Sequence, residues 1–473
     1  MTEGSRVLAV SAGSRSSAET RYPTYDRSAL SPGVVHVGIG RFHRAHQGTY
    51  FDEIAERGIS MDWGVVGVGL RGARQRRELL AQECEYAVLE RSPSRDRVRV
   101  VGSLLDYLSA REEPEAALAA LADPGTKLVT ITVTGDGYGP RLFRYLVEGL
   151  RLRRDAGLSP FTVLSCDNLV RNGEAARRGV LDFASLRDAR LAAWIEEQVA
   201  FPCSVVDRIT PEANDEDVRL LEREFGIHDR APVVCEDFAQ WIVEDRFCAE
   251  RPPLEEVGVQ LVPDASAHET CKKRLLNGGH SAIGYLGSLC GHERVNEAVS
   301  DPLLRRWLGA LMAEEITPLL PPTLGLDLAA YRRSLLKRFS NRGVGDRLAR
   351  LCGRGSVKMP AYLLPSLAEA LEQGRPHGKL TLAVAAWVRY LWGEDLAGEP
   401  FEIKDAMAAE LQPLARRAID DPRPLLGLRE VFGELGENEA FAVELRETLA
   451  TLERRGPRAA AELSLVPDLA AVG

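Results

Sequence analysis

The chain has 473 residues, 45% of them hydrophobic and 27% charged, a composition typical of a soluble globular enzyme with two domains. Its formal net charge of −9 disfavours a general binder of nucleic acid or of anionic membranes, which needs an excess of positive charge. No apolar run approaches the roughly 18 residues that a membrane-spanning helix requires.

The first 30 residues carry the weakest structural signal in the chain. Only a short apolar patch interrupts a composition rich in Ser, Gly and Arg. We therefore expect residues 1–30 to form a flexible leader, and a targeting presequence is not needed to explain it.

Short β-branched runs alternate with helical stretches from Val34 onward. This alternation predicts a parallel, doubly wound α/β sheet of Rossmann type over residues 31–265. The predicted strands are 34–37, 63–68, 86–90, 98–101, 128–133 and 162–165, and the predicted helices are 45–57, 115–121 and 141–156.

A Gly-x-Gly turn follows the first predicted strand. Gly38 and Gly40 let the backbone approach a pyrophosphate, so we expect both glycines to bind a dinucleotide cofactor. Arg41 and Phe42, which begin the next helix, are expected to contact it too. The third glycine of the usual fingerprint is replaced by His43, so a simple tight turn also explains the motif.

Gly69 and Leu70 follow the second predicted strand without the acidic residue that binds the ribose hydroxyls of NAD. Arginines follow instead, and arginine tolerates the 2′-phosphate of NADP, although a solvated helix face would also carry them. We expect NAD as the cofactor and leave NADP open. The arginines are Arg71, Arg74, Arg76 and Arg77.

Amphipathic stretches of helical period dominate from about Ser266. They predict a mainly α-helical second domain over residues 266–473, with a boundary near residue 228 as the alternative. The expected helices cover 269–289, 301–315, 326–340, 362–373, 379–392 and 439–455.

The stretch from Ser266 to His280 carries the most informative chemistry. In an α-helix, at about 100° per residue, Glu269, Asn277 and His280 fall within an arc of roughly 140° from Lys272. Oxidation of an alcohol needs a base, and a lysine can serve when its surroundings favour the neutral amine. An asparagine amide can stabilise the developing alkoxide, and a histidine can bond a neighbouring hydroxyl.

Structural roles for the same stretch remain open. Ser266 and Glu269 match a capping box, and Asn277 with the two glycines after it can break a helix. Lys273 and Arg274 are expected to be solvated.

Two strand ends offer further polar groups. Asn168 follows a predicted strand, and Asp207 ends another apolar run, at positions where open α/β sheets bind ligands. Asn168 is a candidate oxyanion donor and Asp207 a candidate hydroxyl acceptor, although turns and caps also use these residue types.

The eight cysteines are scattered, with no C-x-x-C pair. Only His43 and His46 among the histidines lie close in sequence, and no acid or cysteine completes a usual ligand spacing. The sequence therefore predicts reduced thiols in the cytoplasm and no metal site.

Six segments together resemble one family. They are VHVGIGRFHRAH, SCDNLVRNG, FPCSVVDRITP, CEDFAQWIVED, KKRLLNGGHS and RFSN with GSVKMP, spread in order from about residue 34 to about residue 455. They are similar to the polyol-specific long-chain dehydrogenases, the mannitol dehydrogenase family. The resemblance implies a zinc-independent, NAD-dependent oxidoreductase that interconverts a secondary alcohol of a polyol and the matching ketose.

The same resemblance implies specific roles. The family pattern K-x-x-x-x-N-x-x-H begins at Lys272 as the catalytic base and cannot begin at Lys273, because Asn277 follows Lys272 by five residues. His280 completes that pattern, and Asn168 is the implied oxyanion partner. Residues implied to lie near the substrate are Asp207 (also near the nicotinamide), Glu269 (linked to proton exchange), Lys358 and, as a weaker candidate, Arg350.

One region departs from the family. Members usually carry T-E-x-G-Y after the fourth strand, whereas this chain has Thr134-Gly135-Asp136-Gly137-Tyr138. The loop after Tyr138 is also shortened. Both changes bear on which substrate is used, and a polyol, a ketose or a sugar acid all remain open.

The family is often monomeric, so we expect a monomer, with a dimer open. A uronate reductase is the alternative enzyme, because Arg350 and Lys358 are candidates to clamp a substrate carboxylate. A nucleotide-binding regulatory protein that has lost turnover is the alternative of another class.

Overall fold

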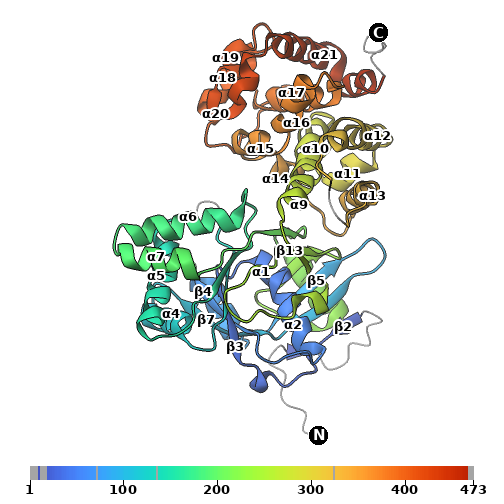
Figure 1. Cartoon of the computed structure of the whole chain (residues 1–473). Coiled ribbons are helices and arrows are strands. Elements are labelled where there is room, and N and C mark those ends of the chain that lie inside the picture. Colours follow the sequence, from blue (N-terminus) through green and yellow to red (C-terminus); the bar gives the residue numbers. More distant parts are fainter. Residues whose placement is uncertain (1–8, 11–18, 71–72, 135–136, 323–324, 467–473) are drawn as a thin grey trace. The chain divides into compact units, whose positions relative to one another are not determined.

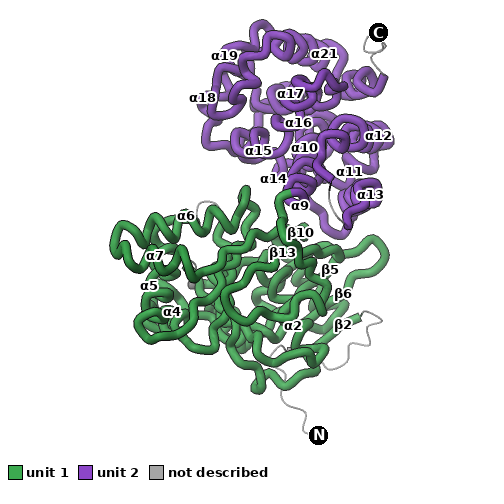
Figure 2. Tube along the Cα trace, viewed as in Figure 1, with its two compact units in different colours: residues 1–266 green, residues 267–473 purple. Residues whose placement is uncertain are grey.

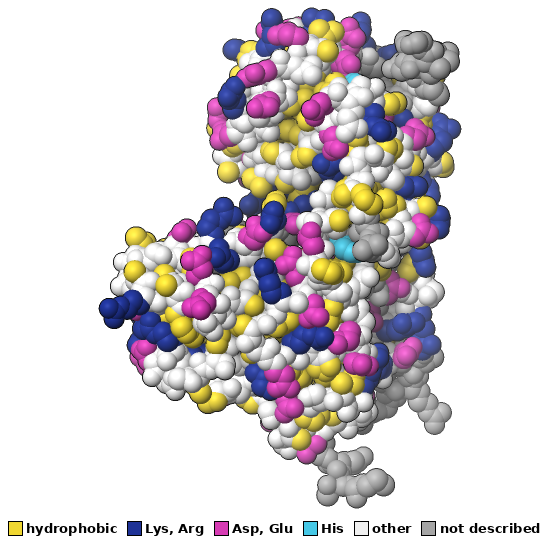
Figure 3. All heavy atoms as spheres, viewed as in Figure 1, with side chains coloured by type: hydrophobic (Ala, Val, Ile, Leu, Met, Phe, Trp, Pro, Cys, Tyr) yellow, Lys and Arg dark blue, Asp and Glu magenta, His cyan; other side chains and the backbone are white. Residues whose placement is uncertain are grey.

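The computed structural model describes residues 9–10, 19–70, 73–134, 137–322 and 325–466 (Figure 1). The chain divides into two compact units, residues 1–266 and 267–473 (Figure 2). Acidic and basic side chains are interspersed over the visible face of each unit (Figure 3).

A five-stranded parallel sheet forms the centre of unit 1, with strand order β7-β4-β3-β8-β9. Counted along the chain, this order is 3-2-1-4-5, which is the Rossmann arrangement. The predicted Rossmann-like α/β fold is therefore confirmed. The strands are β3 (Pro32–Val37), β4 (Gly64–Gly69), β7 (Leu104–Ser109), β8 (Leu128–Ile131) and β9 (Thr162–Ser165).

Helices cover both faces of this sheet, because successive side chains of a strand point to opposite faces. Val34 of β3 packs in one buried cluster with Phe51 and Ile54, whereas Val35 packs in another with Leu146. The helices of unit 1 are α1 (Arg41–Ala45), α2 (Gln47–Glu56), α3 (Ala73–Leu80), α4 (Pro114–Ala122), α5 (Pro140–Asp155), α6 (Asn172–Ser185), α7 (Ala189–Gln198) and α8 (Asp215–Leu220).

Three smaller sheets complete unit 1. Their orders are β12-β5-β6-β2, β10-β13-β14 and β1-β11. The strands are β1 (Ala9–Val10), β2 (Glu19–Arg21), β5 (Tyr86–Arg91), β6 (Arg97–Val101), β10 (Ser204–Asp207), β11 (Ile227–His228), β12 (Val233–Glu236), β13 (Gln240–Glu244) and β14 (Gln260–Val262).

Three expectations need correction. Residues 19–21 pair with β6, and Arg27–Ala29 form a 3-10 helix, so the flexible leader is wrong for residues 19–30. The edge strand β7 was not predicted, because Asp106 and Ser109 interrupt its apolar pattern. The predicted strands 86–90 and 98–101 exist, but they form the antiparallel centre of the second sheet instead of joining the parallel one.

Unit 2 is mainly helical, as predicted. Helix α17 (Gly378–Tyr390) is its central element, because every residue from Lys379 to Tyr390 is buried and it packs against α10 and α21. The other helices are α9 (Ser266–Cys271, starting at the end of unit 1), α10 (Gly278–Leu289), α11 (Val295–Ser300), α12 (Pro302–Ala310), α13 (Leu328–Phe339), α14 (Leu348–Cys352), α15 (Gly355–Tyr362), α16 (Leu364–Glu372), α18 (Ala408–Arg417), α19 (Arg423–Leu426), α20 (Arg429–Phe432) and α21 (Glu439–Ser464).

The two charged residues of α17 are paired inside unit 2. Lys379 forms ion pairs with Glu314 and Glu315, and Arg389 pairs with Glu453. This pairing offsets the cost of placing charges in an apolar interior. In the described part of the chain, no helix has both the length and the apolar character to span a membrane.

Candidate active site

The turn after β3 is shaped by two glycines with different constraints. Gly38 has a φ of +100°, and a Cβ added there would lie 2.2 Å from the carbonyl oxygen of Thr132. A Cβ at Gly40 would find open space, with its nearest neighbour 3.9 Å away. Gly38 is thus required by the fold, whereas Gly40 leaves room for a ligand to approach the backbone, which fits a dinucleotide pyrophosphate.

The histidine in place of the third glycine has a packing role. His43 is buried, and its ring stacks on His36 of β3 with centroids 3.5 Å apart. Burial lowers the pKa of His36 to about 3 and holds the pKa of His43 well below its usual value. Two neutral stacked rings therefore fill the interface between α1 and β3. A glycine in place of His43 would let the backbones of these two elements come closer.

Arg41 and Phe42, which follow this turn, each contact a neighbouring side chain. Arg41 forms an exposed ion pair with Glu212 at 3.4 Å. The ring of Phe42 stacks on His46 with centroids 5.1 Å apart.

Asp167 ties together the ends of β8 and β9. Its carboxylate accepts hydrogen bonds from the backbone N–H groups of Val133 at 3.0 Å and Thr134 at 2.8 Å. Burial raises the pKa of this carboxyl. The next residue, the predicted Asn168, is exposed at the same strand end.

Asn172 connects the Asn168 loop to β10. Its buried amide donates to the carbonyl oxygens of Asp167 at 3.0 Å and Ser204 at 2.9 Å, and its oxygen accepts from the Ser204 N–H. Asp167 and Asn172 were not predicted as supporting residues, although both lie within the segment SCDNLVRN.

Asp207 is buried at the end of β10, and its neighbour Arg208 anchors that strand end. The Arg208 guanidinium donates to Glu90 at 2.6 Å, to the Ala45 carbonyl at 2.5 Å and to the Glu236 carbonyl at 3.1 Å. Three separate segments of unit 1 therefore meet at the Arg208 guanidinium, which anchors the end of β10 next to Asp207.

The predicted helix from Glu269 to Leu289 is not a uniform α-helix. A π-helical segment, η5 (Lys272–Asn277), separates α9 from α10. A π-helix closes each turn between residues i and i+5, so Lys272 and Asn277 lie about one turn apart on the same side. The arc of about 140° expected between them in an α-helix is wrong for this reason.

The functional groups of both residues are shielded from solvent. Lys272 is 9% exposed. The amide nitrogen of Asn277 is buried and makes no hydrogen bond with the residues that the structure describes. The helix continues through Gly278, where a Cβ would lie 3.3 Å from the Tyr362 carbonyl oxygen, so this glycine serves packing against α15 and does not break the helix.

The two basic residues after Lys272 are not solvated, contrary to expectation. Lys273 is buried and forms an ion pair with Glu269. Arg274 pairs with Glu369 at 2.5 Å and donates to the Leu319 carbonyl at 3.2 Å.

His280 is held by an aromatic neighbour. Its ring stacks on Phe339 with centroids 4.1 Å apart. Phe339 lies in the RFSN segment, which explains structurally why that segment accompanies the lysine motif.

Lys358 lies on α15, which packs against η5 and α10. Its amine donates to the carbonyl oxygens of Leu351 at 2.9 Å and Arg350 at 3.3 Å. Burial, with the nearby Arg350 charge, lowers its pKa to about 8. The Arg350 guanidinium is already paired with Asp346 through its Nε at 2.6 Å, so a clamp on a substrate carboxylate would have to compete with that pair.

Several expected features concern residues outside the described part of the chain: Arg71, Gly135 and Asp136. Within the described part, Gly139 and Pro140 lead from Tyr138 directly into α5, as the shortened loop implies. Among the described residues, no group of three His, Cys, Asp or Glu side chains gathers as metal ligands. All eight cysteines are described, and no disulfide joins any two of them.

Two family models match the chain. The mannitol dehydrogenase Rossmann domain matches residues 32–256, and the mannitol dehydrogenase C-terminal domain matches residues 264–453. Mannitol dehydrogenase DSF1 of Saccharomyces cerevisiae is 41% identical over 470 residues, covering 93% of each chain. Mannitol 2-dehydrogenase of Phaeosphaeria nodorum is 42% identical over 468 residues, covering 92% of this chain and 82% of the relative.

Solved structures give the same result. The ternary complex of Pseudomonas fluorescens mannitol 2-dehydrogenase with NAD and D-mannitol superposes with a TM-score of 0.87 at 36% identity, covering 95% of this chain and 98% of that one. A D-sorbitol dehydrogenase in substrate-free form reaches 0.86 at 34% identity, covering 96% of this chain and all of that one. The chain therefore belongs to the mannitol dehydrogenase family.

Proposed function

We propose that this protein is an NAD-dependent polyol dehydrogenase, which interconverts a secondary alcohol of an open-chain polyol of the mannitol or arabinitol type and the matching ketose. The observation that carries the proposal is the buried Lys272 one π-helical turn from the amide of Asn277. A base and an amide donor on one side of a helix are the two groups that alcohol oxidation needs.

Lys272 takes the hydroxyl proton of the substrate. A lysine accepts this proton in its neutral form, and Lys272 is only 9% exposed to water. As the proton leaves, negative charge develops on the substrate oxygen, and the Asn277 amide donates a hydrogen bond to that oxygen. When NAD is bound, its nicotinamide ring supplies the hydride acceptor.

The other predicted residues hold the substrate and the cofactor. His280, fixed by its stacking on Phe339, bonds a neighbouring hydroxyl, and Lys358 bonds a more distant one. Glu269 passes the proton of Lys272 to solvent. In unit 1, Gly38, Gly40, Arg41 and Phe42 contact the cofactor, Asn168 donates to the alkoxide, and Asp207 accepts from a substrate hydroxyl, with Arg350 as a weaker substrate contact.

A panel of substrates tests this proposal. Absorbance of reduced nicotinamide is followed while the protein meets mannitol, sorbitol and arabinitol, fructose, and fructuronate, each with NAD(H) or NADP(H) and with a chelator. We expect chelator-resistant turnover of a polyol–ketose pair with NAD(H). Turnover of fructuronate alone would favour the uronate reductase, and cofactor binding without any turnover would favour the regulatory protein.

Two expectations accompany the proposal and stay predictions. The first is that the protein is cytoplasmic. The second is that it is a monomer, and sedimentation of the purified protein tests this second prediction directly.

A further inference from the structure

Three chain segments end next to one another at the carboxyl edge of the parallel sheet in unit 1. Gly38 follows β3, residues 132–134 follow β8, and Asp167 follows β9. The three strands are neighbours in the order β3-β8-β9 and run parallel. Open α/β sheets bind their ligands at this edge, so contacts among the three segments act on the place where a cofactor and a substrate would meet.

The segment after β8 is bonded to the turn after β3. The Thr132 hydroxyl donates to the Gly38 carbonyl oxygen at 2.8 Å, and Nε2 of His36 lies 2.7 Å from the same hydroxyl oxygen. The backbones are also in close contact, because a Cβ added at Gly38 would lie 2.2 Å from the Thr132 carbonyl oxygen. A shift of the segment after β8 would therefore move the turn that carries Gly38 and Gly40.

Thr134, at the end of this segment, has an unfavourable backbone conformation. Its φ is +65°, in the left-handed region. Among the described residues, five residues other than glycine have a positive φ, and Thr134 is the only one of them with a β-branched side chain. A β-branched residue in this region is a conformational outlier, which persists only where the surrounding structure holds it.

The Asp167 carboxylate holds Thr134 in this conformation. Its Oδ1 accepts from the Thr134 N–H at 2.8 Å, and its Oδ2 accepts from the Val133 N–H at 3.0 Å. Asp167 is 6% exposed, so water competes little for these bonds. Its own backbone is fixed by Asn172, which donates to the Asp167 carbonyl oxygen at 3.0 Å. Asp167 therefore ties the segment after β8 to the end of β9.

Tyr138 fixes the carboxylate from a third direction. Its hydroxyl forms a hydrogen bond with the Ser165 hydroxyl at 2.5 Å. Burial raises the pKa of the Asp167 carboxyl, and hydrogen bonds from the two backbone N–H groups and from the Tyr138 side chain counter that shift. Thr134 and Tyr138, which lie four residues apart in the chain, are thus both hydrogen-bond partners of Asp167.

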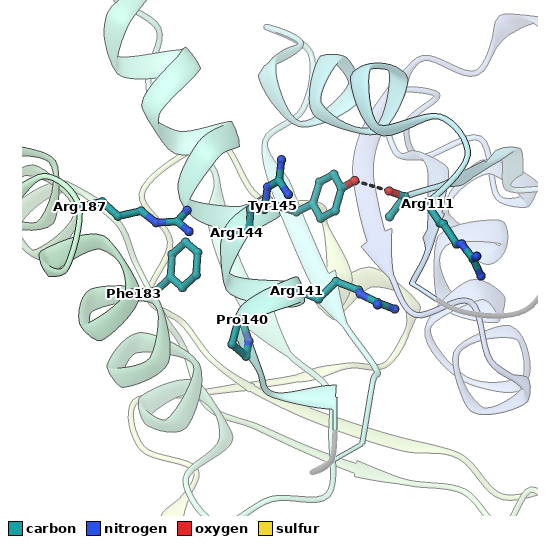
Figure 4. Close-up of a pocket in the computed structure, with 8 residues that line it drawn as sticks. Arg111, Pro140, Arg141, Arg144, Tyr145, Phe183 and Arg187 are labelled. Carbon is teal, nitrogen blue, oxygen red and sulfur yellow. Dashed lines mark hydrogen bonds between the residues drawn. The ribbon is translucent and has the colours of Figure 1, made fainter.

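The helix that follows Tyr138 is anchored as well. Helix α5 begins at Pro140, two residues after Tyr138. In the second turn of α5, the Tyr145 hydroxyl donates to the Ala110 carbonyl oxygen, just beyond the end of β7 (Figure 4). This contact holds the start of α5 against the sheet, and the Tyr138 hydroxyl is held at the sheet edge with it.

We propose that Asp167 is a positioning residue. It holds the cofactor turn at Gly38 and the amide of Asn168 in the relative arrangement that hydride transfer requires, and Tyr138 fixes its carboxylate. Asn168 is the next residue in the chain and is exposed at the end of β9. Through two backbone N–H groups, the same carboxylate reaches the segment that is bonded to Gly38. The inference rests on the proposed function, in which Asn168 donates to the alkoxide.

The substitution Asp167→Asn tests this role. An amide has nearly the same shape as the carboxylate but offers one acceptor oxygen in place of two, so one backbone N–H loses its partner. The matched control is Asp229→Asn. Asp229 is 5% exposed, and its carboxylate also accepts from two backbone N–H groups, those of Ala87 at 2.6 Å and Ala231 at 2.7 Å. These bonds hold the start of β5 in the second sheet.

The measurements are turnover of the polyol that the wild type uses best, NADH affinity by calorimetry, and the thermal midpoint. We expect Asp167→Asn to lower kcat by roughly 10²-fold, the cost of misplacing a reacting group by about 1 Å. The Kd of NADH should rise by about three- to tenfold, the range that one hydrogen bond contributes. Both variants should lower the thermal midpoint, but Asp229→Asn should keep the kcat and the NADH affinity of the wild type.

The proposal is overturned if both variants lose stability and both keep the kcat and the NADH affinity of the wild type, because Asp167 would then serve folding alone. A wild type that binds NADH but turns over no polyol would instead count against the proposed function. In that case a loss of NADH affinity in Asp167→Asn alone still supports the link to the cofactor turn, and equal affinities of the two variants overturn it.

A second variant covers the case in which Asp167→Asn does not fold. Tyr138→Phe removes only the hydroxyl that fixes the carboxylate. We expect it to lower kcat by about three- to tenfold, the effect of one hydrogen bond on the position of Asp167. Unchanged kcat and unchanged NADH affinity in Tyr138→Phe would then overturn the proposal.

Discussion

Lys272 and Asn277 are the first and last residues of a single π-helical segment. The i→i+5 spacing of that segment brings the two side chains to the same side of the helix, where an α-helix would separate them by about 140°. A π-segment lacks the tight hydrogen bonding of an α-helix, and such segments are found frequently at functional sites. The local distortion thus puts the buried Lys272 on the same side of the helix as the Asn277 amide.

Replacing Lys272 should abolish turnover without unfolding the protein. We expect Lys272→Met to lower kcat by roughly 10²–10⁴-fold, since that is the contribution of a general base. Cofactor affinity, measured by calorimetry, should stay unchanged.

The adjacent Lys273 supplies the control. It is equally buried, but its amine is held by Glu269. Lys273→Met should lower kcat far less than Lys272→Met, through its effect on Glu269 alone, and should lower the free energy of unfolding by about 1–3 kcal/mol, because the Glu269 carboxylate loses its ion pair with Lys273. If the two variants lost turnover equally, the assignment of the base to Lys272 would be wrong.

Removing the amide donor should affect the reaction more than substrate binding. Asn277→Ala is expected to lower kcat by roughly 10²–10³-fold, the loss seen when one oxyanion donor is removed. KM should change little, because the hydrogen bond strengthens as charge develops on the substrate oxygen. A rise in KM with unchanged kcat would assign Asn277 to ground-state binding.

The two glycines after β3 should respond differently to the same substitution. Gly38→Ala introduces a Cβ 2.2 Å from the Thr132 carbonyl oxygen at a φ of +100°, so we expect a loss of at least about 1–3 kcal/mol in stability. Gly40→Ala meets open space and should leave the thermal midpoint nearly unchanged while weakening NAD binding. If Gly38→Ala and Gly40→Ala left the protein equally stable and weakened NAD binding equally, this distinction would be wrong.

Arg208 should be a stability residue of unit 1. Its buried guanidinium joins Glu90 and the carbonyl groups of Ala45 and Glu236. Arg208→Met should cost about 3–5 kcal/mol in urea denaturation, because groups that it holds lose their partner. Arg219→Met, which breaks an exposed pair with Glu216, should cost no more than about 1 kcal/mol.

The buried amine of Lys358 should make stability depend on pH. Its pKa is about 8 in the native state, below the ordinary value of 10.5. Between these two values the unfolded chain binds a proton that the native chain does not, so the free energy of unfolding rises with pH. Below about pH 8 both states are protonated, and the burial cost is fully present.

Urea denaturation at pH 7, 9 and 10 measures this dependence. The stability of the wild type relative to Lys358→Met should increase from pH 7 to pH 10. A constant difference across that range would mean that the amine keeps its ordinary pKa in the native state.

Much of the organisation follows from local sequence. The alternation of β-branched runs with helical stretches predicted the Rossmann-like sheet, and amphipathic periods predicted the helical second part, because burial of one face imposes those periods. The lysine motif and the strand-end motifs indicated the family before any coordinates. Each of these signals lies within a few consecutive residues.

Only the tertiary structure decided the rest, because it depends on contacts between distant residues. The strands at Tyr86 and Arg97 join a separate sheet through β12, more than a hundred residues away, and through the N-terminal strand β2. Lys273 is buried although its sequence position suggested solvent. Burial is a sum over neighbours in space, so a single chain segment does not determine it, and the π-helical segment that holds Lys272 and Asn277 packs against the distant helix α15.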